Sequence, residues 1–322
     1  VCRFQNPKND LFFPRHYLRL LMKLSVIICT HTPRPDYLRR VLDALRTQSL
    51  PANQWELLLI DNASTEALAA KWDLSWHPNG RIIREDQLGL TPARLRGIRE
   101  AAAEVLVFSD DDTVLDAEYL AEALRICDEW PMLGAWGGQP TPEFETPPPA
   151  WAGPYLQMLG LCRTEQDCWS NNYDTHSLPI GAGLCILKSV AIQYATVLQS
   201  SAQRSGLDRT GSSLLSGGDT DMALTACDMG MGTARFMALK FAHLIPKARL
   251  TLEYLLALRE GMVFSHVILD SFRPQISPPK PLVRAVAGYF WRMLRCDRYE
   301  RSFQLAAWRG EWKARRMLGD LK

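Results

Sequence analysis

The sequence predicts an α/β protein with a mostly parallel central sheet that is flanked by helices. Through the first 130 residues, short apolar runs of strand length alternate with segments whose apolar residues recur at helical spacing. These runs are nearly continuous, as in strands that are covered on both faces. With 322 residues, 47% of them hydrophobic and 22% charged, the chain has the composition of an ordinary globular protein with one large or two small domains.

The expected elements of this first part form successive strand–helix–strand units. The first strand is residues 24–29, and a loop broken by Pro33 and Pro35 separates it from an amphipathic helix. A helix over residues 91–103 precedes the strand at residues 105–108. Two further strands are expected between these elements, at residues 56–60 and 81–84.

After residue 130 the alternation breaks down. The proline-rich residues 140–154 are not expected to hold a long regular element. Residues 200–213 are polar and contain glycine, as in a mobile loop that either closes over a ligand or is only a slack surface segment. The remaining elements are strands at residues 180–187 and 235–239 and helices at residues 222–229, 251–266 and from 281 onward.

Three consecutive carboxylates, Asp110, Asp111 and Asp112, stand directly after the apolar run at residues 105–108. Adjacent carboxylates repel one another, so clustering them where a buried strand ends is costly without a cation. Mg²⁺ and Mn²⁺ take oxygen ligands and often bridge to a substrate's phosphates. The triplet therefore predicts a metal–diphosphate site. The alternative is an acidic turn in which Asp112 or Asp116 caps the next helix.

Polar residues stand at the ends of three of the expected strands. Thr30 follows the first strand, Asp61 follows the second, and the acidic triplet follows the fourth. Ligands of open parallel sheets gather beyond the carboxyl ends of the strands. We therefore expect these groups to converge on one crevice, an arrangement that strand capping explains for each residue singly but not for all of them together.

Charge and cysteine content narrow the functional classes. A net charge of +2 without a binding motif gives no reason to expect a nucleic-acid partner. The eight cysteines lack the spacing of a zinc site or a disulfide framework, which favours a reducing, cytoplasmic location. No run of about 18 apolar residues predicts a membrane-spanning helix. Met22 directly precedes the first strand, so residues 1–21 are expected to be an upstream extension or an N-terminal arm.

Residues 271–322 are expected to form a basic helical tail. From residue 282 onward, ten Lys or Arg residues stand against four Asp or Glu residues, with aromatic residues such as Trp291 and Trp308 among them. This pattern is typical of a helix that lies on an anionic membrane surface through apolar burial and charge attraction. The alternative is a helix that packs on the main domain with its arginines in water.

Seven segments in order resemble the family 2 glycosyltransferases with the GT-A fold. The first four are SVIICTHTPRPDYLRRVLDAL, ELLLIDNAS, GLTPARLRGI and VLVFSDDDTVL. The last three resemble the acceptor half of bacterial members and are PIGAGLCILKS, GGDTDMAL and FAHLIPKARLT. The resemblance covers residues 22–265 and implies a Rossmann-like GT-A sheet with a C-terminal helical extension. It also implies metal-dependent, inverting transfer of a sugar from a nucleotide-sugar, commonly a UDP-sugar, to a hydroxyl acceptor.

The resemblance also implies how the chain is divided. Residues 22–130 would be the nucleotide-sugar-binding half, and residues 131–270 the acceptor-binding and catalytic half of the same domain. The implied role is polysaccharide or glycolipid biosynthesis, with a saccharide or a lipid-linked molecule as acceptor. A cytoplasmic protein whose tail contacts the inner face of a membrane peripherally would suit a lipid-linked acceptor.

On the donor side the resemblance assigns roles to five residues. Thr30 would lie beside the nucleotide, and Asp61 would hydrogen-bond the base. Arg94 would help to hold the nucleotide or its diphosphate. Asp110 or Asp111 would lie near the ribose.

On the metal and acceptor side, the resemblance makes Asp112 the main ligand of Mg²⁺ or Mn²⁺, with Asp110 and His243 near the ion. Asp219 falls on the catalytic base of the family. Asp221, two residues on, could share or take that role. Four aromatic residues of the second half are candidates for stacking on an acceptor sugar or for ordinary packing: Trp136, Trp151, Trp169 and Tyr173.

Two departures from the family pattern leave other classes open. Gly218 stands where a Glu usually precedes the base, and Leu95 stands in place of an Asn. A glycosyltransferase-like binding protein without turnover would tolerate both changes. A phosphatase of the haloacid dehalogenase class also places two aspartates after a strand, but it needs a Thr where this chain has Val114.

Overall fold

Four parallel strands and two helices form the first part of the molecule. Their bounds are β1 (Leu24–Thr30), β2 (Trp55–Asn62), β3 (Gly80–Glu85), β4 (Val105–Asp110), α1 (Pro35–Arg46) and α2 (Leu90–Glu100). The strands lie in the order β3-β2-β1-β4 and each pair is parallel. The predicted alternation of strands and helices is confirmed, although α2 ends at Glu100 rather than at residue 103.

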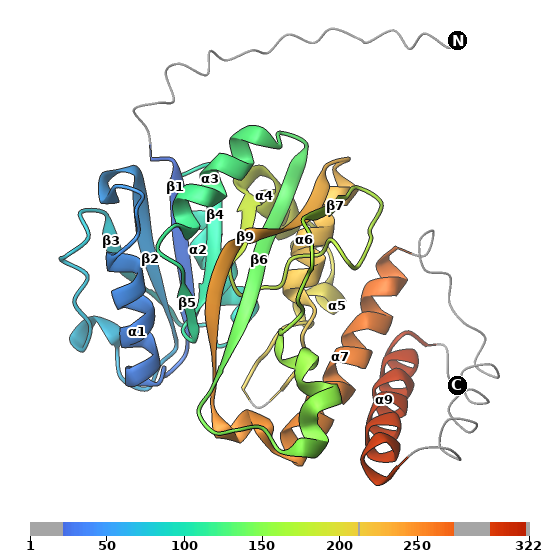
Figure 1. The fold of residues 1–322 in the computed structure, drawn as a ribbon. Helices are drawn as coiled ribbons and strands as arrows, with labels where there is room; N and C mark the ends of the chain where they lie inside the picture. Colours follow the sequence, from blue (N-terminus) through green and yellow to red (C-terminus); the bar gives the residue numbers. More distant parts are fainter. Residues whose placement is uncertain (1–21, 212, 274–296, 320–322) are drawn as a thin grey trace, which may run out of the picture.

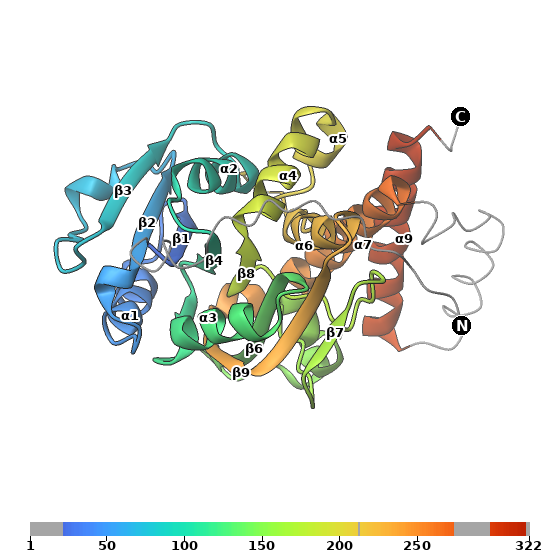
Figure 2. The same cartoon turned by 90° about the horizontal axis from the view of Figure 1, so that it is seen from above.

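Both faces of these strands are buried, which explains their continuous apolar runs. Val26 and Ile28 pack in the same hydrophobic cluster as the apolar face of α1. Ile27, between them, packs in the cluster that contains Ala93 and Ile98 of α2. Successive side chains of a strand point to opposite faces, so α1 and α2 cover opposite sides of the sheet (Figure 2).

An antiparallel strand joins this part to the rest of the sheet. β8 (Leu184–Leu187) pairs antiparallel with β4 on one side and with β6 (Leu133–Phe144) on the other. β6 runs parallel to β9 (Gly232–Ile245). The short strands are β5 (Thr113–Leu115) and β7 (Cys168–Ser170), which both pair with β9. The full order is β3-β2-β1-β4-β8-β6-β9-β5, so both halves share one curled sheet (Figure 1).

The computed structural model describes residues 22–211, 213–273 and 297–319. The expected N-terminal arm and the tail residues 274–296 lie outside the described residues. The remaining helices are α3 (Tyr119–Glu129), α4 (Lys188–Gln199), α5 (Ala202–Ser205), α6 (Gly218–Asp228), α7 (Leu252–Phe272) and α9 (Arg298–Met317). The 3₁₀ helices are η2 (Ala52–Gln54), η3 (Leu68–Ala70), η4 (Ala150–Leu159) and η5 (Lys247–Leu250).

The described part of the tail, α9, packs alongside α7 (Figure 1). Gly310 permits the close approach, because a Cβ there would overlap the carbonyl oxygen of Glu260. The Glu260 carboxylate also accepts hydrogen bonds from Arg309 at 2.9 Å and Lys313 at 2.5 Å. Packing on the main domain therefore holds for α9. No helix among the described residues combines the length and the apolar character that crossing a membrane requires.

The proline-rich segment departs from its prediction, because β6 runs regularly through Pro140 and Pro142. The N–H groups of a strand point alternately to its two sides. Pro140 and Pro142 are two residues apart, so both remove a hydrogen-bond donor from the same side of β6. Beyond Trp136, β6 pairs with β9 on one side and has no pairing with β8 on the other. Both prolines are tolerated there because one side of β6 needs no ladder hydrogen bonds.

Two strands of the second half also differ from their predicted bounds. The strand expected at residues 180–187 begins only at Leu184, because Gly183 has φ +75° and the chain turns there. The strand expected at residues 235–239 is the much longer β9, which contains His243 rather than leading up to it.

Candidate active site

A cavity of about 760 Å³ lies where the carboxyl ends of β1, β2 and β4 meet the second half of the molecule. Thr30 and the acidic triplet line it from the first half, as the strand-end prediction requires. The second half contributes residues of η4, the N-terminal turn of α6, β9, η5 and α7. A volume of this size is in the range of small-molecule sites.

The three carboxylates of the triplet lie close enough to influence one another's charge. Thr30 donates a short hydrogen bond through its hydroxyl group to the Asp111 carboxylate. Burial, and then the charge of Asp112, raise the pKa of Asp111 to about 7. The pKa of Asp110 is also raised, first by burial and then by Asp112, although Arg94 opposes the shift.

Asp112 differs from its two neighbours because Arg249 and His243 lie directly beside it. Arg249 Nη2 lies 2.9 Å from Asp112 Oδ2, and His243 Nε2 lies 3.6 Å from Oδ1. Burial raises the pKa of Asp112, but His243 and Arg249 outweigh burial and lower it to about 2. Pairing of β5 with β9 brings His243 here, since Leu244 N donates to Asp112 O at 2.8 Å.

Two buried polar atoms at this point have no hydrogen-bond partner among the described residues, Asp112 Oδ1 and His243 Nδ1. Buried polar atoms are normally satisfied, so such atoms at a cavity wall mark a place for a ligand. In the part of the chain that the structure describes, no group of three or more His, Cys, Asp or Glu side chains is placed to hold a metal ion by itself. Neither Asp112 nor Asp116 caps the next helix, because the N-cap of α3 is Glu118.

Several arginines also line the cavity. Those in its wall are Arg94 of α2, Arg209 of the loop before α6, Arg235 of β9 and Arg249 of η5. Arg209 and Arg249 both act on the charge of Asp112. Guanidinium groups suit phosphate oxygens, because they offer paired N–H donors.

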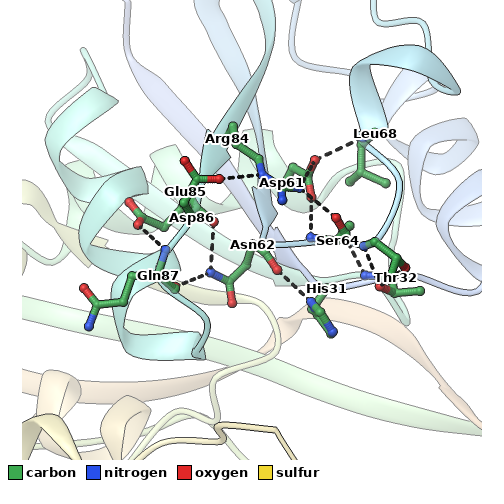
Figure 3. A network of polar contacts seen from close by, with 11 residues as sticks. His31, Thr32, Asp61, Asn62, Ser64, Leu68, Arg84, Glu85, Asp86 and Gln87 are labelled. Carbon is green, nitrogen blue, oxygen red and sulfur yellow. Dashed lines mark hydrogen bonds and ion pairs between the residues drawn. The ribbon is translucent and has the colours of Figure 1, made fainter.

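Asp61 does not form part of the cavity wall. Its Oδ1 accepts a hydrogen bond from Ser64 N at 3.1 Å, and its Oδ2 accepts from Leu68 N at 3.0 Å and Arg84 Nη1 at 2.9 Å (Figure 3). Burial raises the pKa of Asp61, but these hydrogen bonds outweigh burial and hold it below its usual value. Asp61 thus stabilises the loop after β2 through these hydrogen bonds. Its hydrogen bond to the base of a nucleotide stays a prediction.

The next residue, Asn62, does line the cavity together with His31. Asn62 Nδ2 donates to Gln87 O at 2.7 Å, and Asn62 Oδ1 accepts from Gly89 N at 2.8 Å. His31 Nδ1 lies 2.7 Å from Asn62 O (Figure 3). These bonds tie the ends of β1 and β2 to the segment before α2, so this wall is held firmly without a ligand.

Arg94 lines the cavity as predicted, and its guanidinium group is tied to an unexpected partner. Its Nη1 donates to both carboxylate oxygens of Asp208, at 3.0 and 3.2 Å. Both side chains are buried. Asp208 also accepts a hydrogen bond from Thr91 Oγ1 at 2.9 Å. The ion pair therefore fixes Arg94 at the back of the cavity.

Asp219 lies in the cavity wall at the N-terminal turn of α6. Its Oδ2 accepts a hydrogen bond from Gly181 N at 2.9 Å, and its Oδ1 accepts from Thr220 N at 2.8 Å. α6 begins at Gly218 with Gly217 as N-cap, so Asp219 is not the capping residue. Its carboxylate is instead held by backbone amides and directed at the cavity.

Asp221 lies apart from the cavity. It is fully buried, and its Oδ1 accepts a hydrogen bond from Arg273 Nη1 at 2.9 Å. Burial raises the pKa of Asp221 more than Arg273 and Arg204 lower it. Because Asp221 is absent from the cavity wall, the geometry argues against the prediction that it shares the base role.

The aromatic residues considered for acceptor stacking are not in the cavity wall. Trp136 is fully buried in the core. Trp151 stacks on Tyr299 of α9, with ring centroids 5.1 Å apart. Trp169 is exposed on β7, outside the cavity. The part of the wall that the second half forms contains instead side chains of η4 and α7, among them Tyr254.

Sequence reasoning missed Asp208, Arg209 and Arg249. Asp208 and Arg209 lie in the stretch that was expected to be a mobile loop, and no spacing marks them. Arg249 lies six residues after His243 within the segment FAHLIPKARLT, so the same resemblance that indicated His243 could have indicated it.

Parts of the chain are similar in sequence to known glycosyltransferases. Residues 25–176 match the sequence model of the family described as Glycosyl transferase family 2. Glycosyltransferase AglE of Haloferax volcanii is 28% identical over 92 residues, which are 28% of this chain and 30% of AglE. The poly(ribitol-phosphate) beta-N-acetylglucosaminyltransferase TarS of Staphylococcus aureus is 25% identical over 112 residues, which are 34% of this chain and 19% of TarS.

Solved structures of TarS share the fold. TarS 1–349 with UDP superposes with a TM-score of 0.50 at 14% identity, over 93% of this chain and 90% of that one. The complex with UDP-GlcNAc gives a TM-score of 0.50 at 13% identity, over 92% of each chain. The predicted GT-A fold is thus confirmed.

Residues 25–176, a little less than half of the chain, are thus similar to family 2 of the glycosyltransferases. The matched segments span less than a third of the length of either curated relative, AglE or TarS.

Proposed function

We propose that the chain transfers a sugar from a UDP-linked donor to a hydroxyl group of an acceptor. The observation that carries this proposal is that the acidic triplet and Asp219 face one cavity from the two halves of the molecule. A donor bound between them would place its diphosphate beside the strand ends and its sugar toward α6. Further support for a UDP-linked donor comes from TarS, which has been crystallised with UDP and with UDP-GlcNAc.

The residues present fit a divalent cation that is completed by substrate. Asp112 Oδ1 and His243 Nδ1 are buried and lack hydrogen-bond partners among the described residues. Mg²⁺ is usually held by one or two carboxylates and by substrate phosphates rather than by an all-protein cage, so the lack of a three-ligand cluster in the described residues is compatible with it. Asp112 would be the main ligand, with Asp110 and His243 near the ion. Bound Mg²⁺ or Mn²⁺ would stabilise the charge that builds on the leaving diphosphate.

Arg209 and Arg249 would contact the same diphosphate. Both line the cavity, and both lie near enough to the triplet to influence the charge of Asp112. Fixed cationic donors at developing negative charge stabilise a transition state, because they need no reorganisation during the reaction. Thr30 would hold the Asp111 carboxyl group in place through its hydroxyl hydrogen bond.

Asp219 would act as the general base. The acceptor hydroxyl oxygen bonds to the anomeric carbon from the face opposite the diphosphate, its proton passes to Asp219, and the carbon–oxygen bond to the diphosphate breaks to release UDP. A single displacement of this kind inverts the anomeric configuration and needs only one carboxylate. The hydrogen bonds from Gly181 N and Thr220 N orient the carboxylate and leave lone pairs on both oxygens for the incoming proton.

The test of this function is UDP release from a panel of UDP-sugars with Mn²⁺ or Mg²⁺, with water as a slow acceptor. We expect UDP to form from at least one donor, and we expect chelation to stop its formation. A chain that binds UDP with the metal but releases none from any donor would be a binding protein without turnover, as Gly218 and Leu95 first suggested.

We further propose that α9 brings the protein to an anionic membrane and so to a lipid-linked acceptor of glycolipid or polysaccharide synthesis. Leu305, Trp308 and Trp312 recur at helical spacing and remain exposed on the side away from α7. Trp308 and Trp312 lie together, with ring centroids 5.8 Å apart. Apolar side chains with basic neighbours are typical of interfacial helices.

Flotation with liposomes tests this placement. The wild type is compared with a Trp308→Ser, Trp312→Ser variant on vesicles of neutral or anionic lipid. We expect the wild type to float with anionic vesicles and the variant to remain below. Equal partitioning of the two proteins would remove the membrane from the proposal.

A further inference from the structure

Asp208 is the most highly connected carboxylate at the cavity. It lies in the loop between α5 and α6, and its side chain is only 4% exposed. It accepts hydrogen bonds from Thr91 Oγ1 at 2.9 Å, from Arg94 Nη1 at 3.0 Å and from Gly218 N at 3.2 Å. A single carboxylate therefore joins α2 to the first turn of α6, which carries Asp219.

The carboxylate of Asp208 fills the space that a side chain at position 218 would occupy. A Cβ placed on Gly218 would overlap the carboxylate carbon and both oxygens of Asp208. Gly218 does not have a positive φ, so its lack of a side chain is not required by its backbone conformation. The glycine is needed because the acidic group beside α6 comes from the preceding loop instead of from the helix itself.

Arg94 lies between Asp208 and Asp219. Its Nη1 donates a hydrogen bond to Asp208. Its Nη2 lies near Gly181, because a Cβ built on Gly181 would be 3.1 Å from Arg94 Nη2 and 2.7 Å from Asp219 Oδ2. No ion pair joins Arg94 to Asp219 among the described residues, although Asp219 contributes to the electrostatic environment of Arg94. The guanidinium group is thus paired with Asp208 rather than with the candidate base.

We propose that Asp208 is a positioning residue that keeps Arg94 from pairing with Asp219. Its carboxylate takes the place of one that a side chain at position 218 would supply. This inference rests on the proposed function of Asp219 as the base. Without the Asp208 charge, the buried guanidinium group would take Asp219 as its counter-ion, and the lone pairs that receive the acceptor proton would be engaged. The alternative is that this ion pair only stabilises the packing of α2 against α6.

A thermal unfolding cycle tests the shared space and does not depend on activity. Gly218→Ala is expected to lower the Tm of the wild type by several degrees, because its methyl group meets the Asp208 carboxylate. In an Asp208→Ala background, the same change is expected to have little further effect. Tm changes that simply add in the double variant would show that the two positions do not share space, and would overturn the proposal.

Kinetics test the positioning role. Asp208→Asn keeps the shape of the side chain but removes the charge, and we expect kcat to fall at least about tenfold while the donor KM and the UDP Kd stay within about twofold. An Asp208→Ala, Gly218→Glu variant returns a carboxylate from α6 and is expected to recover kcat relative to Asp208→Ala. Glu260→Gln, whose ion pairs join α7 to α9 outside the cavity, is the matched control and should keep the kcat of the wild type.

The outcomes separate this inference from the proposed function. The positioning role would be overturned if Asp208→Asn kept a kcat within twofold of the wild type at an unchanged Tm. Asp208 would then only stabilise the packing of α2 against α6. A loss that appears only in the donor KM would overturn that role as well. If the wild type itself shows no transfer, the proposed function fails, while the unfolding cycle still decides whether Asp208 replaces a side chain at position 218.

Discussion

Two groups of carboxylates face each other across the cavity, and they are built in different ways. At the end of β4 three acids are adjacent in sequence and share few cations. Their pKa values are driven apart, since that of Asp111 is raised to about 7 while that of Asp112 is lowered to about 2. This group carries more negative charge than its own surroundings balance.

Around the N-terminal turn of α6 each carboxylate has its own partner, including Asp221, which lies outside the cavity wall. Asp208 is paired with Arg94, and Asp221 is paired with Arg273. Asp219 is held by backbone amides. The acidic triplet has too few neighbouring cations, so it can bind a cation from solution. Around α6 the other carboxylates are already paired, so Asp219 can remain unpaired in a fixed position. The contrast supports the proposed placement of metal and diphosphate at the strand ends and of proton transfer at α6.

The largest expected effect is on the α6 side, at Asp219. An Asp219→Asn variant should lose about 10²- to 10⁴-fold in kcat, because the general base is gone. UDP should bind as before, since the amide oxygen can still accept a backbone hydrogen bond. The measurement is kcat together with a UDP titration, and Asp43→Asn, an exposed change on α1, is the control. Full activity in Asp219→Asn would give the base role to another group.

The next effect is on the strand-end side, at Asp112. Asp112→Asn should lower kcat/KM by about 10²-fold, because the main carboxylate proposed for the cation is lost. Most of the loss should appear in the donor KM and should not be restored by excess Mn²⁺. Asp116→Asn, four residues on and exposed, serves as the matched control. Equal loss in both variants would show that the effect is not specific to the cavity.

Asp221 should affect stability rather than turnover. Asp221→Asn removes the charged partner of buried Arg273 and should lower the free energy of unfolding by about 2 kcal/mol. The cost is expected to stay moderate because Asp228 still pairs with Arg273 at 2.6 Å. Urea unfolding measures the loss, and kcat of the folded variant should stay near that of the wild type. A large fall in kcat at unchanged stability would contradict the separation of Asp221 from the site.

The smallest expected effect is a pH dependence of stability at Asp111. Its folded pKa of about 7 lies above the usual value of 3.8, so folding favours the neutral carboxyl group. Its contribution to stability is complete below pH 3.8 and is lost as the pH rises to about 7. In chelator, the wild type should therefore lose Tm relative to Asp111→Asn over this window. Parallel Tm curves for the two proteins would contradict the crowding of the triplet.

The strand-end side could be predicted from the sequence, because it depends on local pattern. Thr30 and the acidic triplet follow apolar runs directly, and a parallel sheet must bring such ends to one edge. Asp61 shows the limit of this rule. It stands at a strand end, but Arg84 and the following loop take up its carboxylate, a choice that the strand pattern does not encode.

The α6 side could be predicted only in part. Asp219 was found through a resemblance, but its support by Asp208 and Arg94 depends on how a loop without periodic pattern folds back. Gly218 by itself suggested a missing acid, and only the packing of Asp208 against it shows why a glycine is there. In β6, Pro140 and Pro142 misled the prediction, because the absence of a neighbour on one side of the strand is a tertiary fact.

The most direct test of a cation at the strand ends is calorimetric titration of the wild type with UDP, in Mn²⁺ and then in EDTA. We expect binding in Mn²⁺ that weakens at least about tenfold on chelation, because the acidic triplet then repels the diphosphate. UDP binding of equal strength in both buffers would contradict a metal-held diphosphate and with it the contrast between the two sides of the cavity.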